Sequence, residues 1–280
     1  MRKGRVLAPC LLLAASICAA STAHAADPEY FTATDSMKMT RGDDGVLLVE
    51  MHTDGAPLTF TAQDHEQFVE AFYRIGRDRD NKVVILTGTG GDWIVGVDFP
   101  SFGNVGDADT WSKVHDEGAQ IVENLANIRV PVICAVEGKA WVHSEYCLMA
   151  NVIVAGESAT FHDTPHFAGG IVPGDGIFTT WSYFAGPGRA QAFLLDPQPL
   201  PASTAKDWGV VSEVVPDGTA VSRAEEIAAK MLEGRPQLTL RNTRVHFIQP
   251  LKERLIRETG YGLSLEGASA NALVKQLSQN

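Results

Sequence analysis

The sequence has few basic side chains and no cluster of them. Its 280 residues include 23 Lys and Arg against 34 Asp and Glu, which gives a formal net charge of −11 at pH 7. A chain with this balance repels phosphate backbones and anionic lipid headgroups. Nucleic acids and anionic membrane surfaces are therefore not expected as partners, and highly anionic ligands are disfavoured.

Cysteine is also scarce. The four cysteines are Cys10, Cys18, Cys134 and Cys147, and no Cys–His spacing is typical of a zinc site, so we expect no metal. Cys134 and Cys147 lie in the apolar strings ICAAV and YCLMA, which favours buried free thiols. A disulfide formed in an oxidising compartment is the alternative for this pair.

Long apolar runs are missing except near the N-terminus. Residues 1–25 combine a basic start (MRKGRV), an apolar stretch (LAPCLLLAASICAAS) and a small-x-small site (AHA). The apolar stretch is short for a bilayer span, so this pattern predicts a secretory signal peptide that is cleaved before Ala26. We expect a periplasmic or secreted protein with no membrane attachment after cleavage, and loss of three basic residues takes its charge from −11 to −14.

Strand-like and helix-like segments alternate along the rest of the chain. Short β-branched runs predict buried strands, and apolar residues at helical spacing predict helices. This alternation predicts an α/β fold with largely parallel strands, in a core domain of residues 26–240 followed by a helical region of residues 241–280. The expected strands are residues 45–52, 82–87, 130–136, 152–155 and 210–215, and the expected helices are residues 62–77, 110–127, 176–184, 203–208, 221–233 and most of 241–276.

Several strings, in a fixed order, resemble the crotonase (enoyl-CoA hydratase/isomerase) superfamily. They are NKVVILTGTGG with VGVDF, then VPVICAVEGKAW, ESATFHD, PHFAGGIVPGDG, GPGRAQAFLL and ASTAKDWGVVSEVVP. The resemblance covers about residues 40 to 240. It implies a crotonase-like (ββα) superhelix with a C-terminal helical trimerisation region, and hence a homotrimer or hexamer.

GTGG lacks the Lys and Ser/Thr that follow in a phosphate-binding loop, so no nucleotide is expected.

Two segments depart from the superfamily members that process thioesters. The glycine-rich turn that would supply a backbone amide to an oxyanion reads WVHS at residues 141–144. One of the two hydratase glutamates is kept as Glu145, but His166 stands at the other position, after Pro165. These departures resemble the β-diketone hydrolases of the 6-oxocamphor hydrolase type, which share the string PHF-x-x-GIVPGDG.

That closer resemblance implies a set of catalytic and substrate-binding residues. His166 with Asp175 would activate water, and His143, with His65, would stabilise negative charge. The implied catalytic residues are His65, His143, His166, Asp175 and Glu266, and the residues assigned to substrate binding are Phe60, Val97, Trp141 and Glu145. Phe60 stands where these hydrolases would have a tryptophan.

The chemistry of the implied pair agrees with this assignment. An imidazole with a reference pKa of about 6.5 has a neutral form that can take a proton from water at neutral pH. An ionised carboxylate can fix its tautomer and stabilise the imidazolium. Each residue also has an alternative without a catalytic role. His166 could be a hydrogen-bonded structural histidine, Asp175 could be a helix N-cap, and His143 could be a surface residue of a turn. His65 and Glu266 could be solvated side chains.

The expected activity is therefore retro-Claisen hydrolysis, which cleaves a carbon–carbon bond in a small cyclic or non-enolisable 1,3-diketone. It needs no metal and no organic cofactor. Two alternatives remain, namely an enoyl-CoA hydratase or isomerase that acts on coenzyme A thioesters, and a non-catalytic exported binding protein.

Overall fold

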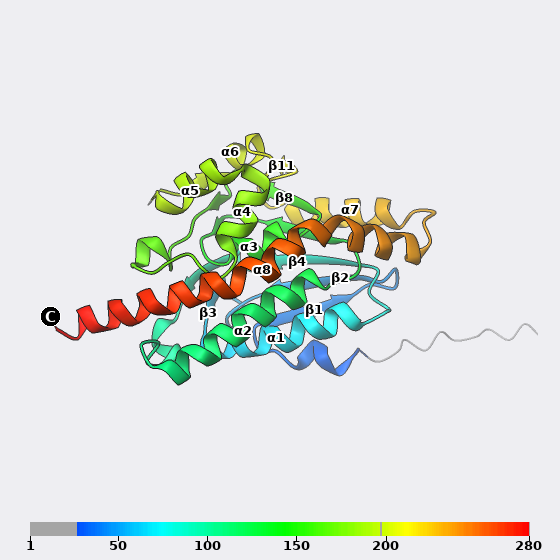
Figure 1. The fold of residues 1–280 in the computed structure, drawn as a ribbon. Coiled ribbons are helices and arrows are strands. Elements are labelled where there is room, and N and C mark those ends of the chain that lie inside the picture. Colours follow the sequence, from blue (N-terminus) through cyan, green and yellow to red (C-terminus); the bar gives the residue numbers. More distant parts are fainter. Residues whose placement is uncertain (1–26, 197, 280) are drawn as a thin grey trace, which may run out of the picture.

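A six-stranded sheet forms the centre of the molecule. The computed structural model describes residues 27–196 and 198–279, so the predicted signal peptide lies outside the described residues. The strand order is β1-β2-β4-β6-β8-β11, with β1 antiparallel to β2 and every later pair parallel (Figure 1). The strands are β1 (Met37–Arg41), β2 (Val46–Met51), β4 (Val83–Gly88), β6 (Val132–Val136), β8 (Val152–Gly156) and β11 (Glu213–Val215).

Both faces of this sheet are buried. In β4, Val84 and Leu86 enter the main core, while Val83 and Ile85 belong to a smaller cluster on the opposite face. Three alanines of α7 (Ala220–Leu232) close that cluster. Strands buried on two sides read as continuous apolar runs, which is why VVIL and VICAV could be assigned from sequence.

Short strands form a second layer beside the main sheet. β4 leads to β5 (Ile94–Val97), β6 to β7 (Lys139–Ala140), and β8 to β9 (Thr160–Phe161). β7, β9 and β10 (Leu200–Pro201) form one small sheet, and β5 pairs with β3 (Leu58–Phe60). This repeated strand–strand–helix unit is the predicted crotonase-like superhelix. The short strands were not predicted, because two to four residues give too little periodicity.

Three long helices cover the face that carries the site. They are α1 (Ala62–Arg77), α2 (Ala108–Ala126) and α8 (Gln237–Leu277). In Figure 1, α8 runs diagonally across this face and its C-terminal end projects past the other elements. The other described helices are η1 (Glu29–Thr32), η2 (Phe99–Phe102), α3 (Ser144–Leu148), η3 (Phe167–Gly169), α4 (Ile177–Ala185), α5 (Pro187–Leu195) and α6 (Ala202–Asp207).

Close backbone contact fixes α8 against the loop before α4. A Cβ atom added to Gly174 would lie only 2.2 Å from the carbonyl oxygen of Gly262. Glycine at both positions therefore lets the loop touch the helix. This contact brings Asp175, next to Gly174, near Glu266, one turn after Gly262.

Most predicted elements are confirmed, with ends within a few residues. The C-terminal helix begins at Gln237, inside the predicted core domain, rather than at residue 241. No helix among the described residues is long and apolar enough to span a bilayer.

The interpretation of the two mature cysteines as free thiols is wrong. Cys134 in β6 and Cys147 in α3 form a disulfide, with Cα atoms 5.4 Å apart. Both side chains are fully buried. The fold places α3 beside β6, so residues 13 positions apart in sequence meet in space.

Candidate active site

A cavity of about 470 Å³ lies between the C-terminal half of α8, helices α1 and α2, and the loops after β5 and β9. This volume is within the range of small-molecule sites. Its titratable lining consists of His65, His143, His166, Asp175 and Glu266, and no described Lys or Arg lines it. The five predicted catalytic residues thus meet in one cavity although 201 positions separate the first from the last.

His143 occupies the altered turn. Its φ and ψ of 49° and 43° are left-handed, an uncommon conformation for a residue other than glycine. The indole N–H of Trp93 donates to the His143 carbonyl, while the His143 ring stacks on Tyr146 and meets the edge of Phe60. Packing on both sides holds a conformation that the isolated turn would disfavour, which is typical of functional sites.

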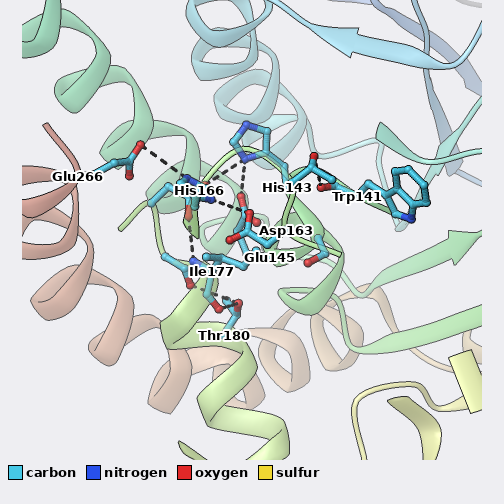
Figure 2. Close-up of polar contacts among 12 residues, drawn as sticks. Trp141, His143, Glu145, Asp163, His166, Ile177, Thr180 and Glu266 are labelled. Atoms are coloured by element: carbon cyan, nitrogen blue, oxygen red, sulfur yellow. Dashed lines mark hydrogen bonds and ion pairs between the residues drawn. The ribbon is translucent and has the colours of Figure 1, made fainter. Parts of the chain in front are cut away.

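Two carboxylates flank the Nδ1 atom of His143. Glu145 Oε1 lies 2.7 Å away and Asp175 Oδ2 lies 3.3 Å away (Figure 2). Burial alone would lower the pKa of His143, but these two carboxylates outweigh it and raise the pKa to about 9. His143 is therefore an imidazolium at neutral pH and can stabilise a developing oxyanion.

His166 is held by a residue that the sequence analysis missed. Its Nδ1 atom lies 2.7 Å from Oδ1 of Asp163, which follows β9. Its Nε2 atom lies 3.6 Å from Asp175 Oδ2 and 3.6 Å from Glu266 Oε1 (Figure 2). The predicted arrangement, with Asp175 behind the imidazole, is corrected: Asp163 orients the ring, and Asp175 lies on its reactive side.

The sequence did contain a signal for Asp163. It stands three residues before His166 in HDTPH, a spacing that lets a side chain reach back within one turn. We assigned no role to it because Asp175 already filled the place that the resemblance gave to the aspartate. The spacing of Asp163 and His166 therefore indicated a possible pair, but the resemblance assigned the aspartate role to Asp175.

The charge state of His166 differs from the expectation. Burial would lower its pKa, but Asp163, Asp175 and Glu266 together raise it well above the usual 6.5. The prediction of a neutral imidazole at neutral pH is thus corrected, because the resting site holds His166 as an imidazolium. Its proton-accepting form becomes abundant only at alkaline pH, and is then a stronger base than a free imidazole.

Asp175 lies between the two histidines. Its Oδ2 atom faces both rings, and its Oδ1 accepts the N–H of Ile177 at the start of α4. Burial would raise its pKa, but His166 and His143 hold it well below the usual range. Asp175 thus lies in the site, though not behind His166 as predicted, and it also has its alternative role at a helix N-terminus.

The two glutamates of the site have the opposite shift. Burial and the charge of Asp175 raise the pKa of Glu145 to about 7, and burial raises that of Glu266. Glu145 Oε2, Glu266 Oε2 and Asp163 Oδ2 are buried without a hydrogen bond from any described residue. Glu145, Asp175 and Glu266 thus share protons with the two imidazoles, so the cluster is suited to moving protons.

His65 forms a separate pair at another wall of the cavity. It follows a capping box made by Thr61 and Asp64 at the start of α1, and its Nδ1 lies 2.9 Å from Glu117 Oε2 in α2. Burial lowers the pKa of His65, while its bond to Glu117 opposes that change. His65 is therefore neutral, with its one N–H on Nδ1 toward the Glu117 carboxylate. Its Nε2 can accept a hydrogen bond but cannot donate one, so the expected stabilisation of negative charge by His65 is corrected.

The substrate-binding assignments are correct in position for only two of four residues. Phe60 and Val97 line the cavity, whereas Trp141 and Glu145 do not. The Trp141 indole donates to Thr160 and points away from the histidines in Figure 2. Glu145 is fully buried behind His143, so its contact is with the catalytic ring and not with the cavity.

One group of described residues has the composition of a cation site. Nitrogen and carboxylate atoms of His143, Glu145 and Asp175 lie within 4.8 Å of one another. Their mutual ion pairs already bring these atoms together, so their proximity does not require a metal.

Comparison with known proteins gives the same fold and two kinds of relative. The family model for enoyl-CoA hydratase/isomerase matches residues 41–267. A solved β-diketone hydrolase from the cyanobacterium Anabaena, bound to (S)-3-oxocyclohexyl acetic acid, is 45% identical, with a TM-score of 0.86 over 89% of this chain and 99% of that one.

Many other matches carry hydratase names. A probable peroxisomal enoyl-CoA hydratase of Arabidopsis thaliana is 29% identical over 229 residues, which is 81% of this chain and 83% of that protein. An enoyl-CoA hydratase/isomerase structure from Mycobacterium paratuberculosis is 24% identical, with a TM-score of 0.78 over 86% of this chain and 98% of that one. The latter likeness concerns the fold alone.

Proposed function

The chain belongs to the enoyl-CoA hydratase/isomerase (crotonase) family, and we propose that it is a β-diketone hydrolase that cleaves a carbon–carbon bond by a retro-Claisen reaction. One observation carries the proposal. Two imidazoles, each held by its own carboxylate, face a single apolar cavity on either side of Asp175. The likeness to the Anabaena enzyme, a β-diketone hydrolase by name, supports the choice of substrate.

The reaction begins with water near Nε2 of His166. That nitrogen, once deprotonated, takes a proton as the water oxygen forms a bond to one carbonyl carbon. The resulting oxyanion is stabilised by the His143 imidazolium. The carbon–carbon bond then breaks, its electron pair leaves as an enolate, and the proton on His166 returns to the enolate carbon. The products are one carboxylic acid and one ketone, joined in one molecule when the diketone is cyclic.

A hydratase is the competing proposal, because the family relatives carry that name and Glu145 is retained. Glu145, however, does not line the cavity, and its Oε1 is bonded to His143. His166 takes the place of the second hydratase glutamate. No described Lys or Arg lines the cavity to receive a coenzyme A phosphate.

Cleavage of a diketone panel tests the proposal. Cyclic and linear non-enolisable 1,3-diketones are incubated in water enriched in heavy oxygen, and the products are analysed by mass spectrometry. We expect one heavy oxygen in the new carboxylate, and loss of turnover in a folded His166→Ala variant. Hydration of crotonyl-CoA without cleavage of any diketone would instead support a hydratase. Inertness toward both would support a binding protein.

We also propose that the mature protein begins at Ala26 in the periplasm or outside the cell, and that it forms trimers or hexamers. The basic, apolar and AHA pattern at residues 1–25 supports export. Crotonase-fold proteins are typically oligomeric, which supports the assembly. N-terminal sequencing that finds Met1 retained, or light scattering that finds only a monomer mass, would contradict these two points.

A further inference from the structure

One helical face of α8 forms the long wall of the cavity. Its lining residues after Glu266 are Ala270, Leu273, Val274 and Leu277, at the spacing of a single helix face. From Glu266 to Leu277 this face extends about 16 Å at the usual rise per residue. Glu266, at the His166 end, carries the only charge, and the next three turns are apolar.

The opposite wall continues this apolar surface. We define the apolar arm of the cavity by Phe99, Phe102, Val105, Leu273, Val274 and Leu277. A Cβ atom on Gly170 would touch Leu273 at 3.5 Å, and one on Gly106 would lie 3.2 Å from Val274, so loops pack close on both sides of the helix end. The arm is therefore a channel with walls, not an isolated helix face.

Hydrogen bonds fix the arm in place. The Trp111 indole donates to the carbonyl of Leu263 at 3.1 Å, and the N–H of Val172 donates to Ser269 Oγ at 2.9 Å. Asn271 also donates to the carbonyl of Gly106. These bonds anchor α8 to α2 and to both loops, so the arm is preformed and needs little ordering when a ligand enters.

The far end of the arm opens to solvent. Phe99 is 50% exposed and Leu277 is 65% exposed, which leaves apolar surface in water at the mouth of a site whose inner end is buried. A small cyclic diketone at the histidines would leave the arm empty. Filling it with methylene groups would remove both ligand and protein surface from water.

We propose that the apolar arm binds an unbranched alkyl substituent, so that the substrate class is an uncharged 1,3-diketone with a medium-length alkyl chain. This inference rests on the proposed diketone hydrolysis and adds its specificity. The diketone group lies among His65, His143 and His166, and the chain extends along α8 toward Leu277. A charged chain end is not expected to enter, since no described charged residue lines the arm.

A homologous series tests the inference. Cyclohexane-1,3-diones that carry one methyl group and one linear alkyl group on the carbon between the carbonyls are compared from methyl to decyl. We expect kcat/KM to rise about threefold to fourfold per added methylene while the chain extends along the arm. Binding of the same series is measured by calorimetry, so that chain-length dependence is visible without turnover.

Two matched variants locate the effect. Leu273→Glu places a charge in the arm and should lower the ratio of kcat/KM for the octyl compound to that for the methyl compound at least about tenfold. Ala272→Glu adds the same charge on the adjacent, exposed face of α8 and should leave this ratio unchanged.

The two proposals can fail separately. Turnover and binding that are independent of chain length would overturn the arm and leave diketone hydrolysis intact. Failure to cleave any diketone would overturn the hydrolysis, and the calorimetric series would still decide whether the arm binds alkyl chains. An equal loss in both glutamate variants would show that charge on α8, rather than the arm, causes the effect.

Discussion

His166 lies among three carboxylates that have different tasks. Asp163 contacts Nδ1, whereas Asp175 and Glu266 lie on the Nε2 side, where water and substrate would be. A carboxylate behind the ring fixes the tautomer that leaves Nε2 free to take a proton. Asp163 is thus a positioning residue, and Asp175 is placed to contact the reacting atoms.

The Asp163 assignment predicts a specific kinetic pattern. His166→Ala should lower kcat about 10²- to 10⁴-fold, the usual contribution of general base catalysis. Asp163→Asn should also lower kcat by up to about 10⁴-fold with little change in KM, since the amide can hold the wrong tautomer. The double variant should be no worse than His166→Ala, because residues that act as one unit do not contribute additively.

Steady-state kinetics on a cleaved diketone check this pattern, with circular dichroism as the test of folding. Asp207→Asn, at an exposed position in α6, is the control for the chemical change and should retain full activity. A folded Asp163→Asn variant with wild-type kcat would remove the orienting role and return it to Asp175.

His143 provides a second residue-scale prediction. Replacement by Asn keeps a residue type that tolerates left-handed backbone but removes the imidazolium. We expect the barrier to rise by roughly 2–4 kcal/mol, the usual effect of losing an oxyanion donor. The measurement is kcat at a fixed alkaline pH. Unchanged kcat together with raised KM would mean that His143 binds substrate without stabilising the transition state.

The sequence was informative for residues whose type departs from a recognisable pattern. His143 and His166 were predicted because each stands where thioester enzymes have another residue. Trp141 was misplaced, because neighbours in a turn point to opposite sides, and a string of letters does not show which side faces the cavity. The pKa of His166 could not be predicted either, since it depends on Glu266, which is 100 positions away in sequence.

At the scale of elements, the disulfide joins the core strand β6 to the helix that carries Glu145. Cys147 follows Glu145 by two residues in α3, and His143 is the N-cap of this helix. The bond therefore ties the catalytic turn to the sheet. Sequence alone gave two apolar strings with one cysteine each, and only the packing of α3 beside β6 reveals that they meet.

Removal of this bond should destabilise the fold. A disulfide that closes a loop of about 15 residues contributes about 3 kcal/mol, mainly by restricting the unfolded chain. We expect Cys134→Ala/Cys147→Ala to lower the free energy of unfolding in urea by about that amount. Adding reductant should produce a similar loss in the wild type and none in the double variant. Alkylation of Cys134 and Cys147 in the denatured, non-reduced wild type, located by peptide mass spectrometry, would contradict the bond.

Long elements were predictable from sequence and short ones were not. Helix α1 was assigned with its correct ends from apolar residues at helical spacing, and the structure adds a capping box at its start. Strands β3, β5, β7 and β9 are too short to show a period, yet they build the layer from which Val97 and the WVHS turn reach the site. The residues of the site were therefore easier to identify than the backbone that positions them.

For the whole molecule, charge separates a diketone from a coenzyme A ester. The chain has a net charge of −11, and no described Lys or Arg lines the cavity. An anionic thioester would have to approach against this field, and its phosphates would find no Lys or Arg in the cavity. We expect no micromolar binding of crotonyl-CoA in calorimetry at physiological salt. A micromolar dissociation constant would revive the hydratase interpretation.

Acidic side chains are also buried around the histidines of the site, where they determine the pH range of activity. His166 must lose its proton to act as base, and its pKa is raised well above 6.5 by Asp163, Asp175 and Glu266. Activity should therefore rise with pH through a range well above 6.5. His143 must keep its proton to stabilise the oxyanion, and its pKa is raised to about 9, so activity should fall above that pH.

The expected profile of kcat/KM is thus a bell with an alkaline optimum, since kcat/KM reports groups of the free enzyme. Glu145→Gln removes one of the two charges that favour the His143 imidazolium, so the alkaline limb should move to lower pH while the acid limb stays nearly in place. These groups are buried and little screened, so moderate salt should not shift either limb. Kinetics from pH 6 to 10 in wild type and Glu145→Gln measure both limbs. An optimum below pH 7 would mean that a carboxylate, with Glu266 as the first candidate, accepts the proton in place of His166.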